Sequence, residues 1–147
     1  KPRPDERELL EDIAERTWAF FETFAGEGRG YIPPDNFQQE PEKRPAVNTS
    51  PTNIGMAMAA AVSAAELGLI TADELEKRLS GTMDTVDKMQ KWHGHLYNWY
   101  RTDTLEVMRP RYVSTVDSGN FCACLITGSM ALKKYGREDT AAWLSAA

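Results

Sequence analysis

The sequence has 147 residues, and its 17 basic and 22 acidic side chains give a net charge of -5 at neutral pH. This acidic balance argues against a nucleic-acid partner, because nucleic-acid-binding surfaces are usually basic. The sequence contains no run of about 18 apolar residues and no basic-then-apolar leader, so we expect no membrane contact by this segment and no secretory signal. Because the chain begins without Met, we expect it to be an excised piece of a longer protein.

Five segments carry the apolar spacing or the end signals of α-helices. We predict helices over residues 5–25, 51–67, 71–91, 118–135 and 140–147. Ser50-Pro51 places a capping hydroxyl before a proline at the first helical position, and Gly68 should end the same helix in the left-handed conformation. A capping box from Thr71 to Glu74 opens the next helix. The Ala- and Met-rich helix over 51–67 should be buried on most sides, and we place Met56, Met58, Met83 and Met89 in the core.

The connections between these helices are long. Residues 26–49 contain four prolines, three glycines and no hydrophobic period, but Tyr31 and Phe37 can anchor them, so we predict an ordered loop. Residues 95–100 alternate polar and aromatic side chains, and they could pair with residues 105–108 as a short hairpin across 101–104. We therefore predict an all-α fold, a partial α/α-barrel (toroid) of about four to five helices with long loops and a short β-hairpin. Because a closed barrel needs more helices, we expect residues 1–147 to be a single fragment of a larger domain.

Polar and aromatic residues gather in loops and at predicted helix starts, in the segments 35–38, 49–53, 93–99 and 114–120. Sugars are recognised by this mixture, because planar amides and carboxylates bind hydroxyls while aromatic faces cover the apolar side of the ring. The candidate substrate-binding residues are Asp35, Asn36, Gln38, Thr49, Ser50, Thr52, Asn53, His95, Tyr97, Asn98, Trp99, Ser118 and Asn120. We predict that these segments converge on one rim of the fold, although capping and core packing are alternative roles for many of them.

Four motifs in these segments carry a family resemblance: PDNFQ at 34–38, TSPTNIG at 49–55, HGHLYNWY at 93–100 and YVSTVDSGN at 112–120. Together they resemble the glycoamylase-like region of bacterial cyclic β-1,2-glucan synthases and, more distantly, endo-β-1,2-glucanases with α/α-barrels. The resemblance implies a large enzyme on the cytoplasmic side of the bacterial inner membrane, with a membrane-embedded glucosyltransferase part, this barrel part and a phosphorylase-like part. It also implies that the barrel closes linear β-1,2-glucan by transglycosylation, and that the present chain is the N-terminal part of that barrel.

Asp117 is the main candidate for a catalytic carboxylate. Glycoside chemistry normally uses two carboxyl groups, one as acid and one as base or nucleophile. The backbone dipoles of a predicted helix start would stabilise the anion of Asp117, which suits a base or a hydroxyl acceptor better than a proton donor. A helix cap, a substrate-binding carboxylate and a direct catalyst remain the alternatives. No second carboxylate obviously pairs with Asp117, and by resemblance the principal catalytic carboxylates lie beyond residue 147.

We expect this segment to form one wall of a glucan-binding cleft and to be inactive alone. A non-catalytic carbohydrate-binding module and a helical piece that docks the remaining domains of the parent enzyme are the alternatives. Two histidines and the closely spaced Cys122 and Cys124 do not have the spacing of a zinc site, so we expect no metal and no cofactor. Because a truncated barrel exposes apolar surface, we expect the fragment to self-associate.

Overall fold

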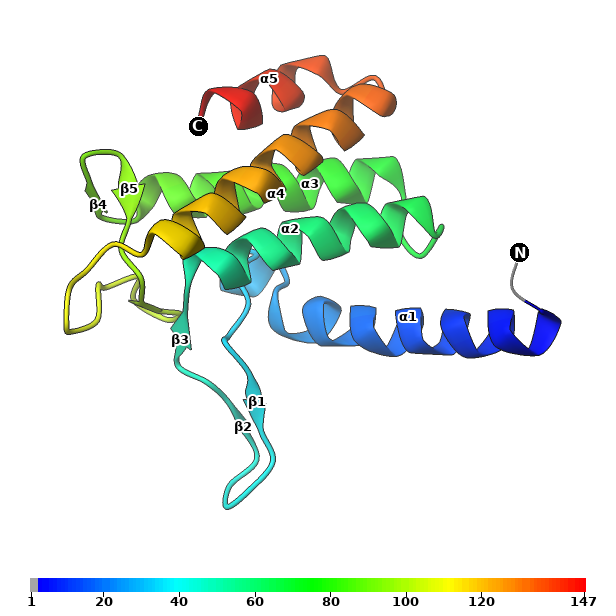
Figure 1. Ribbon diagram of the computed structural model, residues 1–147, viewed down its shortest axis with the longest axis horizontal. Coiled ribbons are helices and arrows are strands. Elements are labelled where there is room, and N and C mark those ends of the chain that lie inside the picture. The colour runs from blue at the N-terminus through cyan, green and yellow to red at the C-terminus, as the bar shows by residue number, and fades with distance from the viewer. Residues whose placement is uncertain (1–2) are drawn as a thin grey trace.

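Residues 3–147, which the computed structural model describes, form five α-helices with long connections on one side. The helices are α1 (Pro4–Phe24), α2 (Pro51–Glu66), α3 (Ala72–Lys88), α4 (Thr115–Lys134) and α5 (Glu138–Ala146), and a 3-10 turn, η1 (Glu27–Arg29), follows α1. Figure 1 shows α2 and α3 side by side and antiparallel, with α4 packed across α2 and α5 folded back along α4. The prediction of an all-α fold is confirmed.

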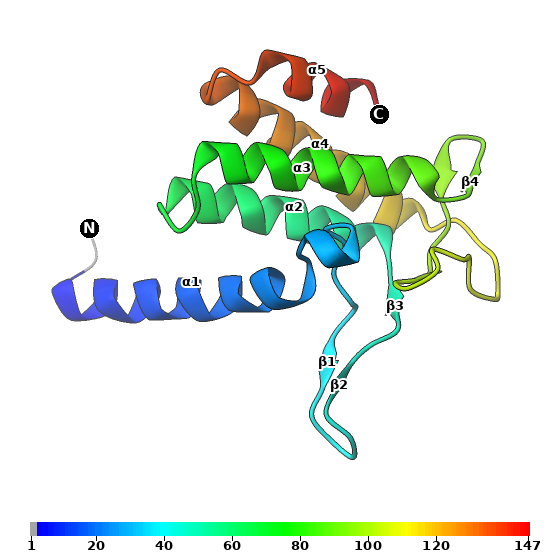
Figure 2. The same ribbon diagram turned by 180° about the vertical axis from the view of Figure 1, so that it is seen from behind.

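Short antiparallel strand pairs connect the loops. β1 (Phe37–Gln38) pairs with β2 (Arg44–Pro45), β3 (Asn48–Thr49) with β6 (Tyr100–Arg101), and β4 (Lys91–Trp92) with β5 (His95–Leu96). The β1–β2 hairpin projects away from the helices in both views (Figures 1 and 2). The β3–β6 pair matters most for the site, because it joins the segment that enters α2 to the segment that leads toward α4.

The predicted hairpin over 95–108 is partly wrong. Residues 95 and 96 pair with the preceding strand instead, because His93 and Gly94 both take positive φ angles, 48° and 86°, and so form a tight two-residue turn. The chain does reverse across residues 101–104, where one isolated bridge joins Tyr100 to Val107.

Local capping chemistry sets the helix starts. Ser50 Oγ accepts a hydrogen bond from the Asn53 N–H at 3.2 Å, and Thr71 Oγ1 accepts one from the Glu74 N–H at the same distance. Gly68 has the predicted positive φ of 75°. Helix α4 begins three residues earlier than predicted, because Ser114 Oγ caps the Asp117 N–H at 3.1 Å. Helix α5 likewise begins at Glu138 rather than at residue 140.

The core lies between α2, α3, α4 and α5. Gly55 brings α2 close to α4: a Cβ at that position would lie 3.1 Å from Cys124 Sγ and 3.3 Å from the Cα of Phe121. Met58, Met83 and Met89 are buried as predicted, whereas Met56 is exposed on the outer side of α2. The largest fully buried aliphatic side chains are Ile32, Ile54, Leu75, Leu79, Leu132 and Leu144. Within residues 3–147, none of the helices combines the length and the apolar character needed to cross a bilayer.

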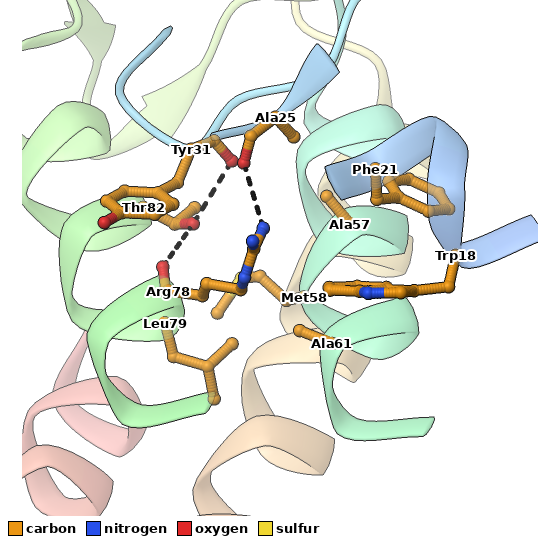
Figure 3. Close-up of a pocket in the computed structure, with 10 residues that line it drawn as sticks. All are labelled: Trp18, Phe21, Ala25, Tyr31, Ala57, Met58, Ala61, Arg78, Leu79 and Thr82. Atoms are coloured by element: carbon orange, nitrogen blue, oxygen red, sulfur yellow. Dashed lines mark hydrogen bonds between the residues drawn. The ribbon is translucent and has the colours of Figure 1, made fainter. Parts of the chain in front are cut away.

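Trp18 anchors α1 to this core. The guanidinium of Arg78 lies 4.8 Å from the centroid of the Trp18 ring, and its Nη1 donates to the Ala25 carbonyl at 3.3 Å (Figure 3). Arg78 Nε also donates to Glu74 at 2.7 Å. The small cavity beside these groups has a volume of about 10 Å³, about the space that one water molecule needs. These contacts hold the second half of α1, whereas Leu9, Leu10 and Ile13 in the first half are exposed.

Candidate functional site

The first turns of α2 and α4 lie at the same end of the fold as the long loops (Figure 1). Thr52 is in the first turn of α2 and Asn120 follows the first turn of α4, and Asn120 Nδ2 donates to Thr52 Oγ1 at 3.1 Å. This bond joins segments 68 residues apart in the sequence. Two helix N-termini therefore face this end, where the positive ends of the helix dipoles favour negatively charged or hydrogen-bond-accepting groups.

Asn98 connects the loop after α3 to the start of α4. Its side-chain amide takes the orientation that satisfies both ends: Nδ2 donates to Asp117 Oδ2 at 3.0 Å, and Oδ1 accepts from Trp99 Nε1 and the Tyr112 hydroxyl, both at 2.7 Å. The Asn98 backbone N–H also donates to the Tyr112 carbonyl at 2.9 Å. Only 5% of Asn98 is exposed, so these bonds offset the cost of burying its amide.

Asp117 is held as an anion. Partial burial alone would raise the pKa of its carboxyl group, but hydrogen-bonding groups of Ser114, Thr52 and Ser50 outweigh this effect and leave the pKa below its ordinary value of 3.8. Asp117 lies in the first turn of α4, and Ser114 is the capping residue. An ionised carboxylate of this kind accepts hydrogen bonds and cannot supply a proton at neutral pH.

Asp35 is a second carboxylate at the same end. Its Oδ1 accepts from Asn53 Nδ2 at 2.8 Å and its Oδ2 accepts from Asn36 Nδ2 at 3.0 Å. Asn53, which binds Asp35, follows Thr52 directly in α2, and Thr52 hydrogen-bonds to both Asn120 and Asp117, so two consecutive residues link the two carboxylates. The segment of Asp35 was predicted to reach this rim, but its bond to Asn53 depends on the path of the loop between α1 and α2, which no local pattern marks.

Other predicted residues lie elsewhere or are covered. Gln38 is in the projecting β1–β2 hairpin, opposite Arg44. His95 and Ser118 line a separate groove of about 400 Å³ over Phe121. Thr49 and Ser50 are buried and Tyr97 packs against the core, so these three residues support the loop end of the fold from its interior. Their roles as sugar contacts stay predictions.

Tyr112 and Ser114 lie within the predicted motif at 112–120, but neither was among the individual residues expected to bind substrate. Tyr112 is 45% exposed, although its hydroxyl and carbonyl are both bound to Asn98. The signal for Tyr112 was its place in the 112–120 motif, whereas Tyr97 and Trp99 were the aromatic residues named as candidate sugar contacts, with core packing as the alternative. Ser114 could have been found as a hydroxyl three residues before Asp117.

Comparisons with known proteins agree with this fold. Residues 12–124 match the family described as a protein of unknown function, DUF3131. The cyclic β-(1,2)-glucan synthase NdvB of Rhizobium meliloti (strain 1021) is 46% identical over 134 residues, which cover 91% of this chain and 5% of that protein. The chain thus spans a small part of that relative's length. The predicted resemblance to cyclic β-1,2-glucan synthases is confirmed at the level of sequence.

Solved structures share the helical arrangement. A candidate glucoamylase from Bacteroides caccae ATCC 43185 superposes with a TM-score of 0.77 at 17% identity, over 94% of this chain and 36% of that one. The endo-β-1,2-glucanase from Chitinophaga pinensis, solved with sophorotriose and glucose, superposes with a TM-score of 0.78 at 13% identity. The match covers 94% of this chain and 35% of the glucanase chain. The fold is therefore a part of a glucoamylase-like α/α-toroid, and the chain belongs to the DUF3131 family.

Proposed function

We propose that this chain forms one wall of a β-1,2-glucan-binding cleft in a larger enzyme that synthesises and cyclises β-1,2-glucan by transglycosylation-type chemistry. The observation that carries the proposal is the hydrogen-bonded cluster that joins Asp35, Asn53, Thr52, Asn98, Asp117 and Asn120 at one end of the helices. The glucan synthase relative and the endo-β-1,2-glucanase with the similar fold support β-1,2-glucan as the substrate class.

In this proposal Asp117 accepts a hydroxyl of the glucan, because its neutral hydrogen-bond partners keep it ionised. Residues 1–147 form the N-terminal part of a larger α/α-barrel catalytic domain. The principal catalytic carboxylates come from other parts of that enzyme. The enzyme is anchored on the cytoplasmic side of the bacterial inner membrane. The chain alone is inactive, since a wall of a cleft without a proton donor cannot complete the acid–base pair.

A docking module is the second candidate function. Val116, Ile126 and Met130 are exposed along α4. Exposed apolar side chains at helical spacing are typical of a surface that another helix covers. This surface is compatible with the glucan proposal, because one segment can both line a cleft and pack against the remaining domains of the parent enzyme.

The test compares binding of linear β-1,2-glucan and of β-1,3-glucan of the same length to the full-length protein that contains this chain. Replacing Asn53 and Asn120 together by Ala should weaken β-1,2-glucan binding by about tenfold or more, because two amides leave the cluster. The matched control replaces Gln39 and Gln90, which are exposed amides outside the cluster, and should bind like the wild type. Equal binding of both glucans, or equal loss in both variants, would contradict the proposed cleft wall.

A second measurement addresses the inactivity of the chain alone. The 147-residue chain, incubated with linear β-1,2-glucan, should yield neither shorter nor cyclic products. Efficient cleavage or cyclisation by this chain would show that it contains a complete catalytic pair, and Asp35 and Asp117 would then be the residues to replace first.

A further inference from the structure

The exposed ring of Tyr112 and the carboxylate of Asp117 are both bound to the Asn98 amide. Oδ1 of Asn98 accepts from the Tyr112 hydroxyl, and Nδ2 donates to Asp117, so one planar group spans the distance between them. The backbone bond from Asn98 to the Tyr112 carbonyl fixes the loop that carries the tyrosine. The relation between ring and carboxylate is therefore set by three bonds to a residue that is itself buried.

Of the two aromatic residues whose side chains are hydrogen-bonded to Asn98, Tyr112 is the more exposed, at 45%. The indole N–H of Trp99 is turned inward to Asn98, and its side chain is half-buried. Tyr97 packs against the core. Phe37 is stacked on Phe24, with 5.3 Å between the ring centroids. An exposed ring whose polar tip is tied down can receive an apolar face without first losing its own rotational freedom.

We propose that Asn98 is a positioning residue, and that it holds the Tyr112 ring and the Asp117 carboxylate together as one subsite for a single glucose unit. The ring of Tyr112 contacts the apolar C–H face of the sugar, and Asp117 accepts one of its hydroxyl protons in a hydrogen bond. This inference rests on the proposed function, because it assumes that the ligand is a glucan.

The electrostatics of the site support this arrangement. Besides Asn98, the groups that hold Asp117 come from the start of α2, namely Ser50 and Thr52, and from Ser114 before α4. All of these groups are neutral, so the carboxylate keeps its full charge for a hydroxyl donor instead of sharing it with a lysine or an arginine. An aromatic floor beside a charged acceptor is the pairing that binds a pyranose ring from its face and its edge.

The first test measures linear β-1,2-glucan binding to the full-length protein with Tyr112→Ala and Tyr112→Phe. Tyr112→Ala should weaken binding by about threefold to tenfold, because the ring contact is lost. Tyr112→Phe keeps the ring but frees it from Asn98, so its affinity should fall between those of the wild type and the Ala variant. Tyr135 is the matched control, since its hydroxyl also binds a side chain, Glu66 Oε1 at 3.1 Å, at the other end of α4.

Each outcome of this test has a defined meaning. If Tyr112→Ala binds as tightly as Tyr135→Ala, the ring is not part of a subsite and the inference is wrong. If Tyr112→Phe binds like the wild type, the tether to Asn98 is not needed and the positioning role is wrong. Tyr112 lies on the surface, so these variants should fold even where a change at the buried Asn98 does not.

The second test follows the Asp117 carboxyl carbon by NMR during an acid titration, and it does not depend on glucan. Asn98→Leu removes the donor to Asp117 and should move the titration midpoint to higher pH. Asn53→Leu, which removes a donor to Asp35 instead, should leave the midpoint unchanged. If the wild type fails to bind glucan, the proposed function is wrong, and the glucose subsite is wrong with it. If the titration midpoint of Asp117 is unchanged in Asn98→Leu, Asn98 does not position Asp117.

Discussion

Tyr31 lies directly against Gly81 of α3, so closely that a Cβ added to Gly81 would be 2.3 Å from Cδ2 and Cε2 of the tyrosine ring. Tyr31 is buried and has a positive φ of 59°, which few residues other than glycine adopt. Thr85 Oγ1 donates to the neighbouring Gly30 carbonyl at 2.8 Å. These contacts close the loop after α1 onto α3 and so fix the start of the segment that leads to Asp35.

Gly81→Ala should therefore destabilise the fold. Replacing glycine by alanine inside a helix ordinarily stabilises it by up to about 1 kcal/mol, but the buried Tyr31 ring cannot move away without losing its own packing. We expect the free energy of unfolding to fall by about 1 to 3 kcal/mol in a urea titration. Gly119→Ala in α4 is the control, because nothing lies within 4 Å of its added Cβ, and it should stabilise by about 0.5 to 1 kcal/mol. A gain in both variants would show that Tyr31 is not fixed.

The buried phenol of Tyr100 should make the free energy of unfolding depend on pH in the alkaline range. Its hydroxyl donates to the Gln90 carbonyl and accepts from the Tyr97 N–H, both at 2.7 Å, and burial raises the pKa of its phenol from 10.0 to about 12. The folded state holds this proton more tightly than the unfolded state, so the contribution is complete below pH 10 and is lost as the pH rises toward 12. Tyr100→Phe should lower the free energy of unfolding at pH 7 by about 1 to 3 kcal/mol. Above pH 10 the free energy of unfolding of this variant should fall less steeply than that of the wild type. Parallel pH profiles for the two proteins would contradict this assignment.

The helix starts could be predicted from the sequence because capping is local chemistry. Ser50 before Pro51, and Thr71 three residues before Glu74, satisfy backbone donors within one turn, so the pattern and the structure agree. The start of α4 was placed three residues too late, although Ser114 stands three residues before Asp117 in the same capping pattern as Ser50 and Asn53. Met56 was wrongly placed in the core because α2 is apolar on nearly every side, which hides the one side left uncovered.

The composition of the candidate site was predictable, but its connections were not. Polar motifs near residues 35, 52, 98 and 117 could be recognised as chemically alike, and residues from all four lie in the hydrogen-bonded cluster. Which amide meets which carboxylate depends on the β3–β6 pair and on the loop before α4, and no local pattern marks either. The same dependence explains why His95, a candidate sugar contact, lines a groove over Phe121 instead of joining this cluster.

Self-association is the next prediction. Ile126 and Met130 project from α4 with more than half of each side chain exposed, and Val116 continues the stripe toward the start of the helix. Sedimentation velocity of the 147-residue chain should show dimers or larger species. In the double variant Ile126→Glu, Met130→Lys the affinity of self-association should be lower by about tenfold or more. Leu67→Glu, at an equally exposed position at the end of α2, should associate like the wild type. A monomer at high concentration would refute this prediction.

Asp117 should also stabilise the fold in a pH-dependent way. The lowered pKa means that the folded state prefers the ionised carboxylate, so the stabilisation is present above its ordinary pKa of 3.8 and is lost as the pH falls through the folded value. Asp117→Asn should lower the free energy of unfolding at pH 7 by about 0.3 to 1 kcal/mol, the usual size of a carboxylate effect at a helix N-terminus. The difference should vanish in acid. Asp84→Asn on the exposed face of α3 serves as the control, and a pH-independent loss in Asp117→Asn would rule out the charge as its cause.

Replacing Asp117 in the full-length enzyme distinguishes binding from catalysis. If the carboxylate accepts a sugar hydroxyl in the ground state as well as in the transition state, Asp117→Asn should raise KM by about tenfold and leave kcat nearly unchanged. A direct base or nucleophile would instead lose about a hundredfold or more in kcat. Lys88 on the outer face of α3 provides the control, and it is preferable to Glu76, which accepts a hydrogen bond from Thr140 and contributes to α3–α5 packing. Because the neutral donors around Asp117 lower its pKa and so weaken it as a base, the change in KM is the expected result.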